Sequence, residues 1–180
     1  MSSLKRSTST AVIIAALAGS AAIATATPAA AASYHCKTST KSIDDPSYSG
    51  PWADNWDFTV RICAKRSGST VYSYANISWD GPVYADADDT SIFDDAYFKL
   101  QIKKSQAGTD PVKKQANFGG IEAKLEHSGS DANYNGSYTT GTISYKIGST
   151  KGLGDGELKL DWNNDGAGVR TYPFTASPTV

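Results

Sequence analysis

Alternation of apolar and polar residues between positions 56 and 80 constrains the fold of this chain more than any other feature. Four apolar residues alternate with polar ones before the turn RSGS at 66–69, and four more follow it: Trp56, Phe58, Val60, Ile62, Val71, Ala75, Ile77 and Trp79. Successive side chains of a strand point to opposite faces of a sheet, so a period of two is typical of half-buried β-structure. The segment 56–80 therefore predicts a β-hairpin with one apolar face.

Shorter segments repeat this pattern towards the C-terminus. Strands are predicted at 97–104, 121–127, 138–147, 158–162 and 169–174, and a loop at 105–120. The residues expected to face inward are Phe98, Leu100, Ile102, Ile121, Ala123, Leu125, His127, Ile143, Tyr145, Ile147, Leu158, Leu160 and Trp162. No segment predicts a helix of ten or more residues.

About seven strands with one apolar face each predict an all-β fold. Two antiparallel sheets bury such faces against each other, so the expected architecture is an antiparallel β-sandwich formed by residues 55–180 as a single domain. A closed β-barrel is the alternative, because it also leaves no apolar face exposed.

The first 32 residues have the features of a secretory signal peptide. Lys5 and Arg6 precede the apolar run AVIIAALAGSAAIA, and Ala30-Ala31-Ala32 supplies the small residues that signal peptidase requires. The apolar run is shorter than the roughly 20 residues that a transmembrane helix needs, so no membrane span is predicted. We expect cleavage after residue 32 and a secreted, extracellular protein.

Residues 33–54 are polar and turn-rich, and they predict an extended or irregular N-terminal arm. This arm contains Cys36, and the only other cysteine is Cys63. Two cysteines in an exported chain most often form a disulfide. Because Cys63 is out of phase with the apolar residues of its strand, its sulfur is expected on the opposite face, where the disulfide would clamp the arm across the outside of the sheet.

The charge balance excludes an electrostatic footprint for nucleic acid. The whole chain has 17 basic and 18 acidic residues, and removal of Lys5 and Arg6 with the leader leaves a mildly acidic protein. Such a balance gives no attraction for DNA, RNA or an anionic membrane surface. No nucleic-acid partner is predicted.

No catalytic residue can be assigned, so we predict a protein that is not an enzyme. The chain has only two histidines, His35 in the polar arm and His127 in the apolar register of an expected strand, where it should be packed. No GxSxG motif is present for nucleophilic catalysis. With 18 acidic residues, a carboxylate pair for glycoside hydrolysis is always conceivable and therefore carries no information.

Calcium is the only metal that the sequence brings into question, and no cofactor is predicted. DWNNDG places Asp161, Asn163 and Asp165 as in the opening of an EF-hand loop, but Tyr172 stands where a bidentate glutamate is needed. An ordinary hairpin turn is the favoured interpretation. The acidic segment at 85–89, with Asp94 and Asp95, predicts a solvated loop, and the shortage of His and Cys excludes zinc.

Aromatic residues are the candidate contacts for a partner. The arm and the expected outward positions of the strands contain Tyr34, Tyr48, Trp52, Tyr72, Tyr74 and Tyr138. Exposed tyrosine suits stacked and hydrogen-bonded contact with a sugar or a protein. Tolerance of tyrosine on any two-faced sheet is the other explanation.

The alanine-rich leader, the polar arm held by one disulfide and the tryptophan-bearing β domain without an active site resemble small non-enzymatic proteins that actinobacteria secrete. Among these, the layout resembles the small adaptor subunit of the umbrella toxin particles of Streptomyces-type bacteria. The resemblance implies a secreted adaptor that joins a lectin-like subunit to a large toxin subunit in an extracellular antibacterial particle. An extended arm or an open sheet edge would then hold a partner by strand addition.

Two other functions stay open at this point. One is a free-standing module that binds glycan or cell wall, and the other is a protease inhibitor that presents the disulfide-bound arm as a rigid loop.

Overall fold

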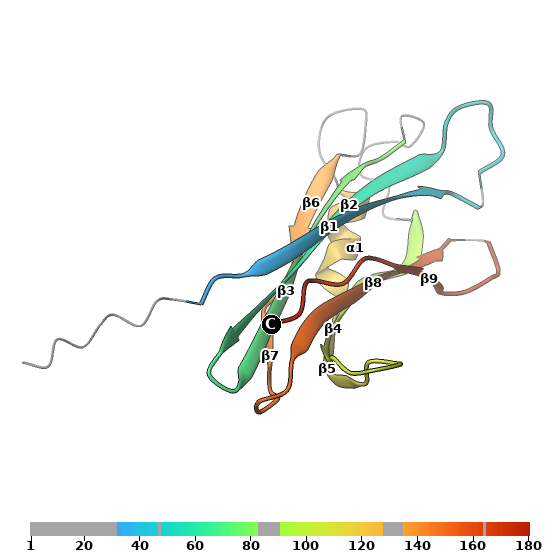
Figure 1. The fold of residues 1–180 in the computed structure, drawn as a ribbon. Helices are drawn as coiled ribbons and strands as arrows, with labels where there is room; N and C mark the ends of the chain where they lie inside the picture. The colour runs from blue at the N-terminus through green and yellow to red at the C-terminus, as the bar shows by residue number, and fades with distance from the viewer. Residues whose placement is uncertain (1–31, 47, 83–90, 128–134, 164) are drawn as a thin grey trace, which may run out of the picture. The chain divides into compact units, whose positions relative to one another are not determined.

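Two antiparallel sheets form the protein in a computed structural model that describes residues 32–46, 48–82, 91–127, 135–163 and 165–180 (Figure 1). In the first sheet the order is β1 (His35–Asp44), β2 (Asn55–Ser67), β3 (Thr70–Asp80), and then β6 (Gly136–Thr139) and β7 (Ile143–Lys146), which both pair with β3. In the second sheet the order is β5 (Val112–Phe118), β4 (Phe93–Lys104), β8 (Gly152–Trp162) and β9 (Arg170–Pro173). The β-sandwich is confirmed, and the closed barrel is not found. The predicted leader lies almost wholly outside the described residues.

The core lies between the two sheets and uses the apolar residues that the alternation singles out. Residues from β2, β3, β4 and β8 are at most 4% exposed: Trp56, Phe58, Val60, Ile62, Val71, Ala75, Ile77, Trp79, Phe98, Leu100, Ile102, Leu158, Leu160 and Trp162. The Trp56 ring lies 5.7 Å from that of Phe93 and 6.4 Å from that of Trp162, so the sheets join at this end through aromatic contacts. The hairpin predicted at 56–80 is confirmed as β2 and β3.

β1 is an edge strand of the first sheet. Its ten residues pair with β2, from His35 opposite Ala64 to Asp44 opposite Asn55. The phase that points towards the second sheet is polar over most of its length, and only Ile43 enters the core, at 4% exposed. Residues 35–44 of the expected arm are therefore a strand of the sandwich.

The C-terminal segment 174–180 lies between β8 and β1 (Figure 1). The N–H groups of Ser177 and Val180 donate to the carbonyls of Gly154 and Gly152 at 2.9 and 2.8 Å, which continues the pairing along β8. On the other side, the Thr175 N–H donates to Ser39 Oγ at 3.0 Å. This segment takes the place of apolar packing beneath β1, which explains why a polar strand is tolerated there.

The strand expected at 121–127 is wrong. A 3-10 turn (Gly119–Ile121, η1) and a short helix, α1 (Glu122–Glu126), occupy this region. Ile121 and Leu125 are fully buried, and their spacing of four residues suits one helical face as well as one strand face. The Glu122 carboxylate accepts the Ala96 N–H at 2.8 Å. His127 is exposed, so its expected packing is wrong too.

Residues 112–118, expected within a loop, form the edge strand β5. This strand pairs with β4 but is mostly exposed, and only Ala116 and Phe118 pack against the core. It contains Lys113 and Lys114, which weaken the apolar signal of the segment.

The strand expected at 138–147 is interrupted at residues 140–142. Thr140 bridges the break, because its N–H donates to the Ala75 carbonyl at 3.0 Å and its Oγ1 accepts the Ala75 N–H at 2.9 Å. The interruption reverses the phase of the residues before it. Tyr138 is opposite Ile77 and packs against the core, so its expected outward orientation is wrong. Tyr145 keeps the expected inward phase opposite Val71, but it is 37% exposed.

The disulfide between Cys36 and Cys63 is confirmed, and so is the position of Cys63 in the phase opposite to the apolar residues of β2, but the predicted clamp of a separate arm is wrong. The two cysteines are directly paired on β1 and β2. The bond therefore joins neighbouring strands within one sheet and does not hold a separate arm across its outside.

Among the described residues, no helix has the length and apolar character needed to cross a bilayer.

Candidate functional site

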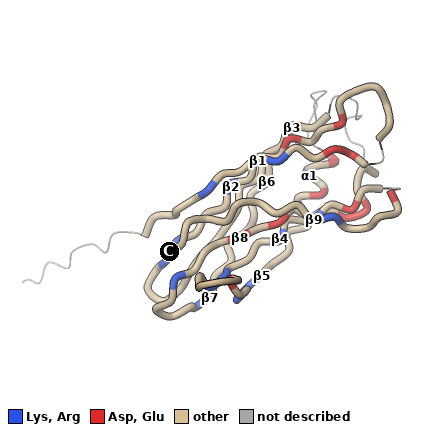
Figure 2. The backbone as a smooth tube through the Cα atoms, turned by 45° about the vertical axis from the view of Figure 1, so that its right-hand side comes forward, with Lys and Arg blue, Asp and Glu red and all other residues tan. Residues whose placement is uncertain are grey.

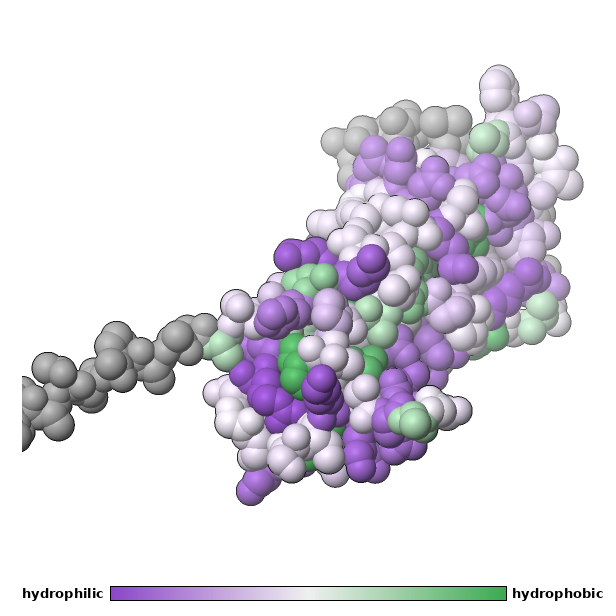
Figure 3. Space-filling model, viewed as in Figure 1, coloured by the Kyte–Doolittle hydropathy of each residue, from purple (hydrophilic) through white to green (hydrophobic). Residues whose placement is uncertain are grey.

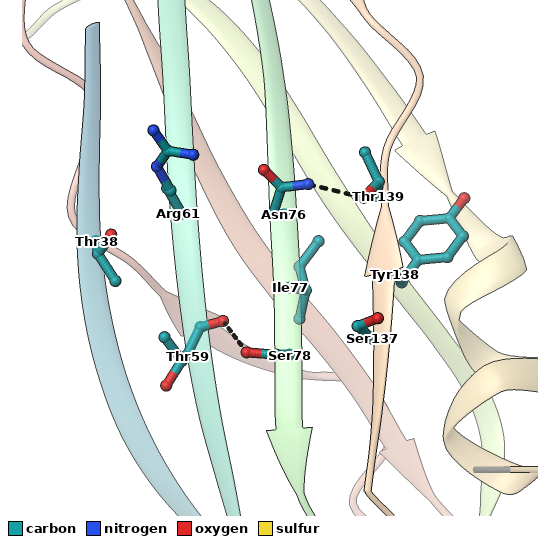
Figure 4. Close-up of a pocket in the computed structure, with 9 residues that line it drawn as sticks. All are labelled: Thr38, Thr59, Arg61, Asn76, Ile77, Ser78, Ser137, Tyr138 and Thr139. Atoms are coloured by element: carbon teal, nitrogen blue, oxygen red, sulfur yellow. Dashed lines mark hydrogen bonds between the residues drawn. The ribbon is translucent and has the colours of Figure 1, made fainter. Parts of the chain in front are cut away.

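The outer face of the first sheet, meaning the side turned away from the second sheet, is the candidate site. Its central part is a shallow hollow of about 400 Å³, bordered by β1, β2, β3 and β6 (Figure 4). Side chains from the outward phase of these strands line it: Thr38, Thr59, Arg61, Asn76, Ser78, Ser137 and Thr139. We call this site the hydroxyl hollow, since most of its groups are Ser and Thr hydroxyls.

The strand register builds the hydroxyl hollow from two rows. Arg61 lies between Thr38 and Asn76, and Asn76 is in turn opposite Thr139. The neighbouring row runs from Thr59 through Ser78 to Ser137. Directly paired side chains on one face of a sheet lie about 5 Å apart, so polar groups from four strands meet on a surface that is nearly flat.

Arg61 is the main unsatisfied group of the hydroxyl hollow. It is exposed, and within the described part of the chain its guanidinium makes no hydrogen bond or ion pair. Beside it, the Asn76 amide donates to Thr139 Oγ1 at 2.7 Å, which fixes the side chain (Figure 4). A guanidinium offers five N–H donors in a planar array that matches carboxylates, phosphates and amide carbonyls.

A tyrosine cluster adjoins the hydroxyl hollow on the same face and consists of Tyr34, Tyr72, Tyr74 and Lys65. The rings of Tyr34 and Tyr74 meet edge to face, with centroids 4.8 Å apart. The Lys65 Nζ lies 4.7 Å from the Tyr34 centroid and 5.6 Å from that of Tyr72, a cation–π arrangement. All four residues are half-buried, so they form a preorganised contact surface.

The disulfide positions one member of the tyrosine cluster. Cys63 is opposite both Cys36 on β1 and Tyr74 on β3, and Tyr34 precedes Cys36 by two residues. Since alternate residues share a face, Tyr34 lies on the outer face beside this row. The cross-link thus holds the start of β1 where Tyr34 meets Tyr74.

Charges on the outer face of the second sheet satisfy one another. Glu157 contacts Lys99 at 2.9 Å and Lys159 at 3.0 Å, and Lys103 pairs with Asp155. Burial raises the pKa of Glu157, but the hydrogen bonds and charges of Lys99 and Lys159 outweigh burial and hold that pKa below its ordinary value. The three lysines that β4 and β8 place on this face, Lys99, Lys103 and Lys159, are thus all engaged, whereas Lys113 on the edge strand β5 is exposed and makes no salt bridge among the described residues.

The structure brings together only part of the predicted partner-binding set. Tyr34, Tyr72 and Tyr74 meet in the tyrosine cluster. Tyr48 and Trp52 lie in the β1–β2 connection, where the Trp52 N–H donates to the Tyr48 hydroxyl at 3.3 Å and Trp52 is 66% exposed. The ten residues of β1, about 33 Å of strand, separate that connection from the cluster.

Tyr138 was predicted to belong to the contact surface, but it does not. It lies at the border of the hydroxyl hollow, but its ring turns towards α1 and packs against the core (Figure 4). The outward positions of its strand are Ser137 and Thr139.

The weak calcium candidate does not form a ligand set within the described residues. Asp165 pairs with Arg170 at 2.9 Å, and the Asn163 amide donates to the Ser91 carbonyl at 2.7 Å. Desolvation raises the pKa of Asp161, and the charges of nearby aspartates, Asp94, Asp165 and Asp95, add to this effect. No group of three His, Cys, Asp or Glu gathers for a metal in the parts of the chain that are described. The acidic segment 85–89 lies outside them.

Sequence reasoning missed the residues of the hydroxyl hollow. Arg61 occupies an outward position of a strand that the alternation identified, which is the one signal available. Its neighbours Thr38 and Thr139 come from β1 and β6, and a single sequence gives no sign that these two strands flank the hairpin.

Comparisons with known proteins identify no relative. No protein-family model matches the sequence, and no match is found among curated proteins or solved structures.

Proposed function

We propose that this chain is an exported, non-enzymatic adaptor that holds a partner protein against the outer face of its first sheet. The observation that carries the proposal is the contrast between the two outer faces. The central strands β4 and β8 of the second sheet pair the lysines of their outer face, whereas the first sheet presents an unpaired Arg61 beside three clustered tyrosines. Tyrosine and arginine contribute most to the affinity of protein interfaces, because they combine large contact area with hydrogen bonding.

Polar contact fits this surface better than apolar burial does. In the view of Figure 3, which has β1 and the C-terminal segment in front, hydrophilic residues predominate and hydrophobic residues form small, separate patches. Interfaces between proteins that also exist apart are about as polar as the rest of the surface. The tyrosine cluster and the hydroxyl hollow supply rings, hydroxyls and donors of the required kind.

Lysines on one edge strand of each sheet make strand addition unfavourable, and this favours binding through the outer face of the first sheet. In β1 of the first sheet, Lys37 and Lys41 stand in the phase that points towards the second sheet, and in β5 of the second sheet, Lys114 stands in the phase that points towards the first. Inward-pointing charges on edge strands are a known means of blocking edge-to-edge pairing. Side chains of the face, rather than the open backbone of β1, are therefore the proposed contact.

Export is supported by the leader and by the disulfide. Residues 1–32 have the order of a secretory signal peptide, and disulfides persist mainly outside the reducing cytoplasm. Together with the resemblance in layout to an umbrella-particle adaptor, these features support a partner in a secreted assembly with antibacterial function.

Capture from the culture supernatant of the producing organism tests the proposal. The tagged protein is expected to elute from a sizing column with much larger partners. The variant Arg61→Ala/Tyr74→Ala should elute alone, while Tyr97→Ala/Lys124→Ala, which removes one tyrosine and one cation elsewhere, should keep its partners. Elution of the unaltered protein alone, at its own mass, contradicts the adaptor function.

Glycan binding is the second candidate, and the hydroxyl hollow is the observation that favours it. Ser and Thr hydroxyls, one amide and one guanidinium beside aromatic rings are groups that hold sugars. Pull-down on chitin, cellulose and peptidoglycan tests this candidate. Retention that a soluble oligosaccharide reverses, and that Arg61→Ala abolishes, favours it over the adaptor, whereas absence from all three pellets removes it.

A further inference from the structure

The small net charge of the chain conceals two poles of opposite sign. Figure 2 shows most acidic residues around α1 and β9, and most basic residues around β5, β7 and the C-terminus. Strand register explains the acidic pole, where β2 and β4 begin and β3 and β8 end: Asp57, Asp80, Asp94, Asp95, Glu122, Asp161 and Asp165. The opposite end holds Lys104, Lys113, Lys114, Lys146 and Lys151, which we call the basic pole.

Hydrogen bonds join three separate turns at the basic pole. The Ser105 N–H donates to the Lys151 carbonyl at 2.9 Å, and the Lys104 N–H donates to the Pro111 carbonyl at 3.0 Å. The Arg66 guanidinium donates to the Gly148 carbonyl at 2.8 Å and also to the carbonyl of Thr150. These bonds fix the β2–β3, β4–β5 and β7–β8 turns against one another, so the lysines have a stable arrangement.

The lysines of the basic pole are free to meet an external anion. In the described residues none of the five makes a salt bridge, in contrast to Lys99, Lys103 and Lys159 further along the second sheet. Four of the five are exposed, and Lys104 is half-buried. Arg66, whose donors are used by backbone carbonyls, has a structural role instead.

Distance separates the two poles electrically. Lys151 and Asp161 stand at opposite ends of β8, ten residues or about 33 Å of strand apart. This separation exceeds the Debye length of about 8 Å at physiological ionic strength. An anion at the basic pole is therefore screened from the acidic residues, and the net charge of the chain does not predict its affinity.

We propose that the basic pole binds a hydrated polymer with repeated phosphate groups, such as an anionic polymer of the cell envelope. The lysines come from four elements and do not converge on one pocket, which suits a repeating charge better than a single small anion. The turns at this end consist mostly of Ser, Gly, Thr, Ala and Gln with Asp110 and Pro111, and their one large apolar residue, Ile147, packs against the core. Val112 and Tyr145 are exposed here but stand on separate strands, and the described residues form no amphipathic helix at this end for insertion into a bilayer. The inference needs the proposed export but not the proposed partner on the outer face.

Binding to beads that carry poly(glycerol phosphate) tests the inference, with neutral dextran beads as a blank. The full-length secreted protein should bind at about 50 mM salt and be released by about 200 mM. Lys146→Gln/Lys151→Gln should lower the slope of log affinity against log salt by about 1.5, since each lysine contributes roughly 0.7–0.9. The control variant Lys41→Gln/Lys124→Gln removes the same number of positive charges at positions outside the basic pole, so it should leave this slope unaltered.

Three results would overturn the inference. The first is no binding to the phosphate polymer, and the second is an equal loss in both double variants, which would reflect net charge alone. The third is tighter binding to anionic lipid vesicles or duplex DNA than to the polymer. Arg61→Ala/Tyr74→Ala should bind the polymer like the unaltered protein, so failure of the proposed partner contact is distinguishable from failure at the basic pole.

Discussion

Removal of the disulfide should release β1 from the sheet while the rest of the sandwich stays folded. β1 is held at one end by Ile43, its only residue in the core, and near the other end by Cys36. Between them, the phase that points towards the second sheet is polar and partly or fully exposed. Burial of Ile43 contributes about 1.5–3 kcal/mol, and nothing comparable secures the first half of the strand.

The expected magnitude follows from the loop that the disulfide closes. The two cysteines are 27 positions apart, and a loop of this length restricts the unfolded chain by roughly 3.5 kcal/mol. For a domain of this size, the double variant Cys36→Ala/Cys63→Ala should melt about 7–14 °C lower. The loss acts on global stability, whereas release of β1 is an additional local effect.

Hydrogen exchange followed by mass spectrometry separates these two effects. In Cys36→Ala/Cys63→Ala, the peptide that covers β1 should lose protection well before the peptide that covers β3. Leu158→Ala is the matched control, because its fully buried side chain costs a similar 2–5 kcal/mol but lies outside β1. If β1 in the cysteine variant stays protected as long as β3 does, the disulfide does not pin the strand and the reasoning is refuted.

Three further predictions concern stability. Gly156→Ala should cost about 1–3 kcal/mol, because a Cβ there would lie 2.4 Å from the Phe98 ring; an unchanged melting temperature would contradict this. The lowered pKa of Glu157 means that its ion pairs stabilise the fold above the ordinary value of 4.5 and are lost as pH falls through the folded-state pKa. Denaturant titrations at decreasing pH should therefore show a steeper loss for the unaltered protein than for Glu157→Gln, and parallel losses would refute the assignment. Asp161→Asn should raise stability at neutral pH, since the pKa of Asp161 is raised, and the gain should vanish at pH values below 3.8; no gain at neutral pH would contradict the cause given.

The hairpin of β2 and β3 was predictable because every inward position between 56 and 62 is large and apolar. β1 was not predictable as a strand, because the C-terminal segment lies beneath it and Ile43 is the only residue that it contributes to the core. The same reason applies to β5, where pairing with β4 holds an exposed strand that has little apolar content. Edge strands are stabilised by neighbours that are distant in sequence, and alternation does not report them.

Two other predictions, the strand at 121–127 and the outward orientation of Tyr138, were wrong because the spacing of residues was misinterpreted, although their apolar character was not. Ile121 and Leu125 are an even number of residues apart, so they fit a strand, but their spacing of four also fits α1. The interruption at 140–142 moves Tyr138 to the opposite face from the one expected by counting from Ile143. A shift of one residue reverses a whole strand, and Gly141 within the expected strand was the one local signal of this shift.

The candidate site was predictable only in part. Tyr72 and Tyr74 lie on the outer face because β3 keeps strict alternation, and the disulfide was evident from the two cysteines. The meeting of Tyr34 with Tyr74, and of Arg61 with Asn76 and Thr139, depends on strand order. The charge poles were hidden for the same reason, since a sum over the chain discards where each charge lies.

Hydroxyl-radical footprinting of the complex captured from culture supernatant tests the central claim most directly. The outer face of the first sheet and that of the second each carry half-buried tyrosines, which allows comparison within one molecule. Binding through the first sheet predicts that oxidation of Tyr72 and Tyr74 falls in the complex while that of Tyr97 on β4 is unchanged. Protection of Tyr97 with unaltered oxidation of Tyr72 and Tyr74 would contradict the claim.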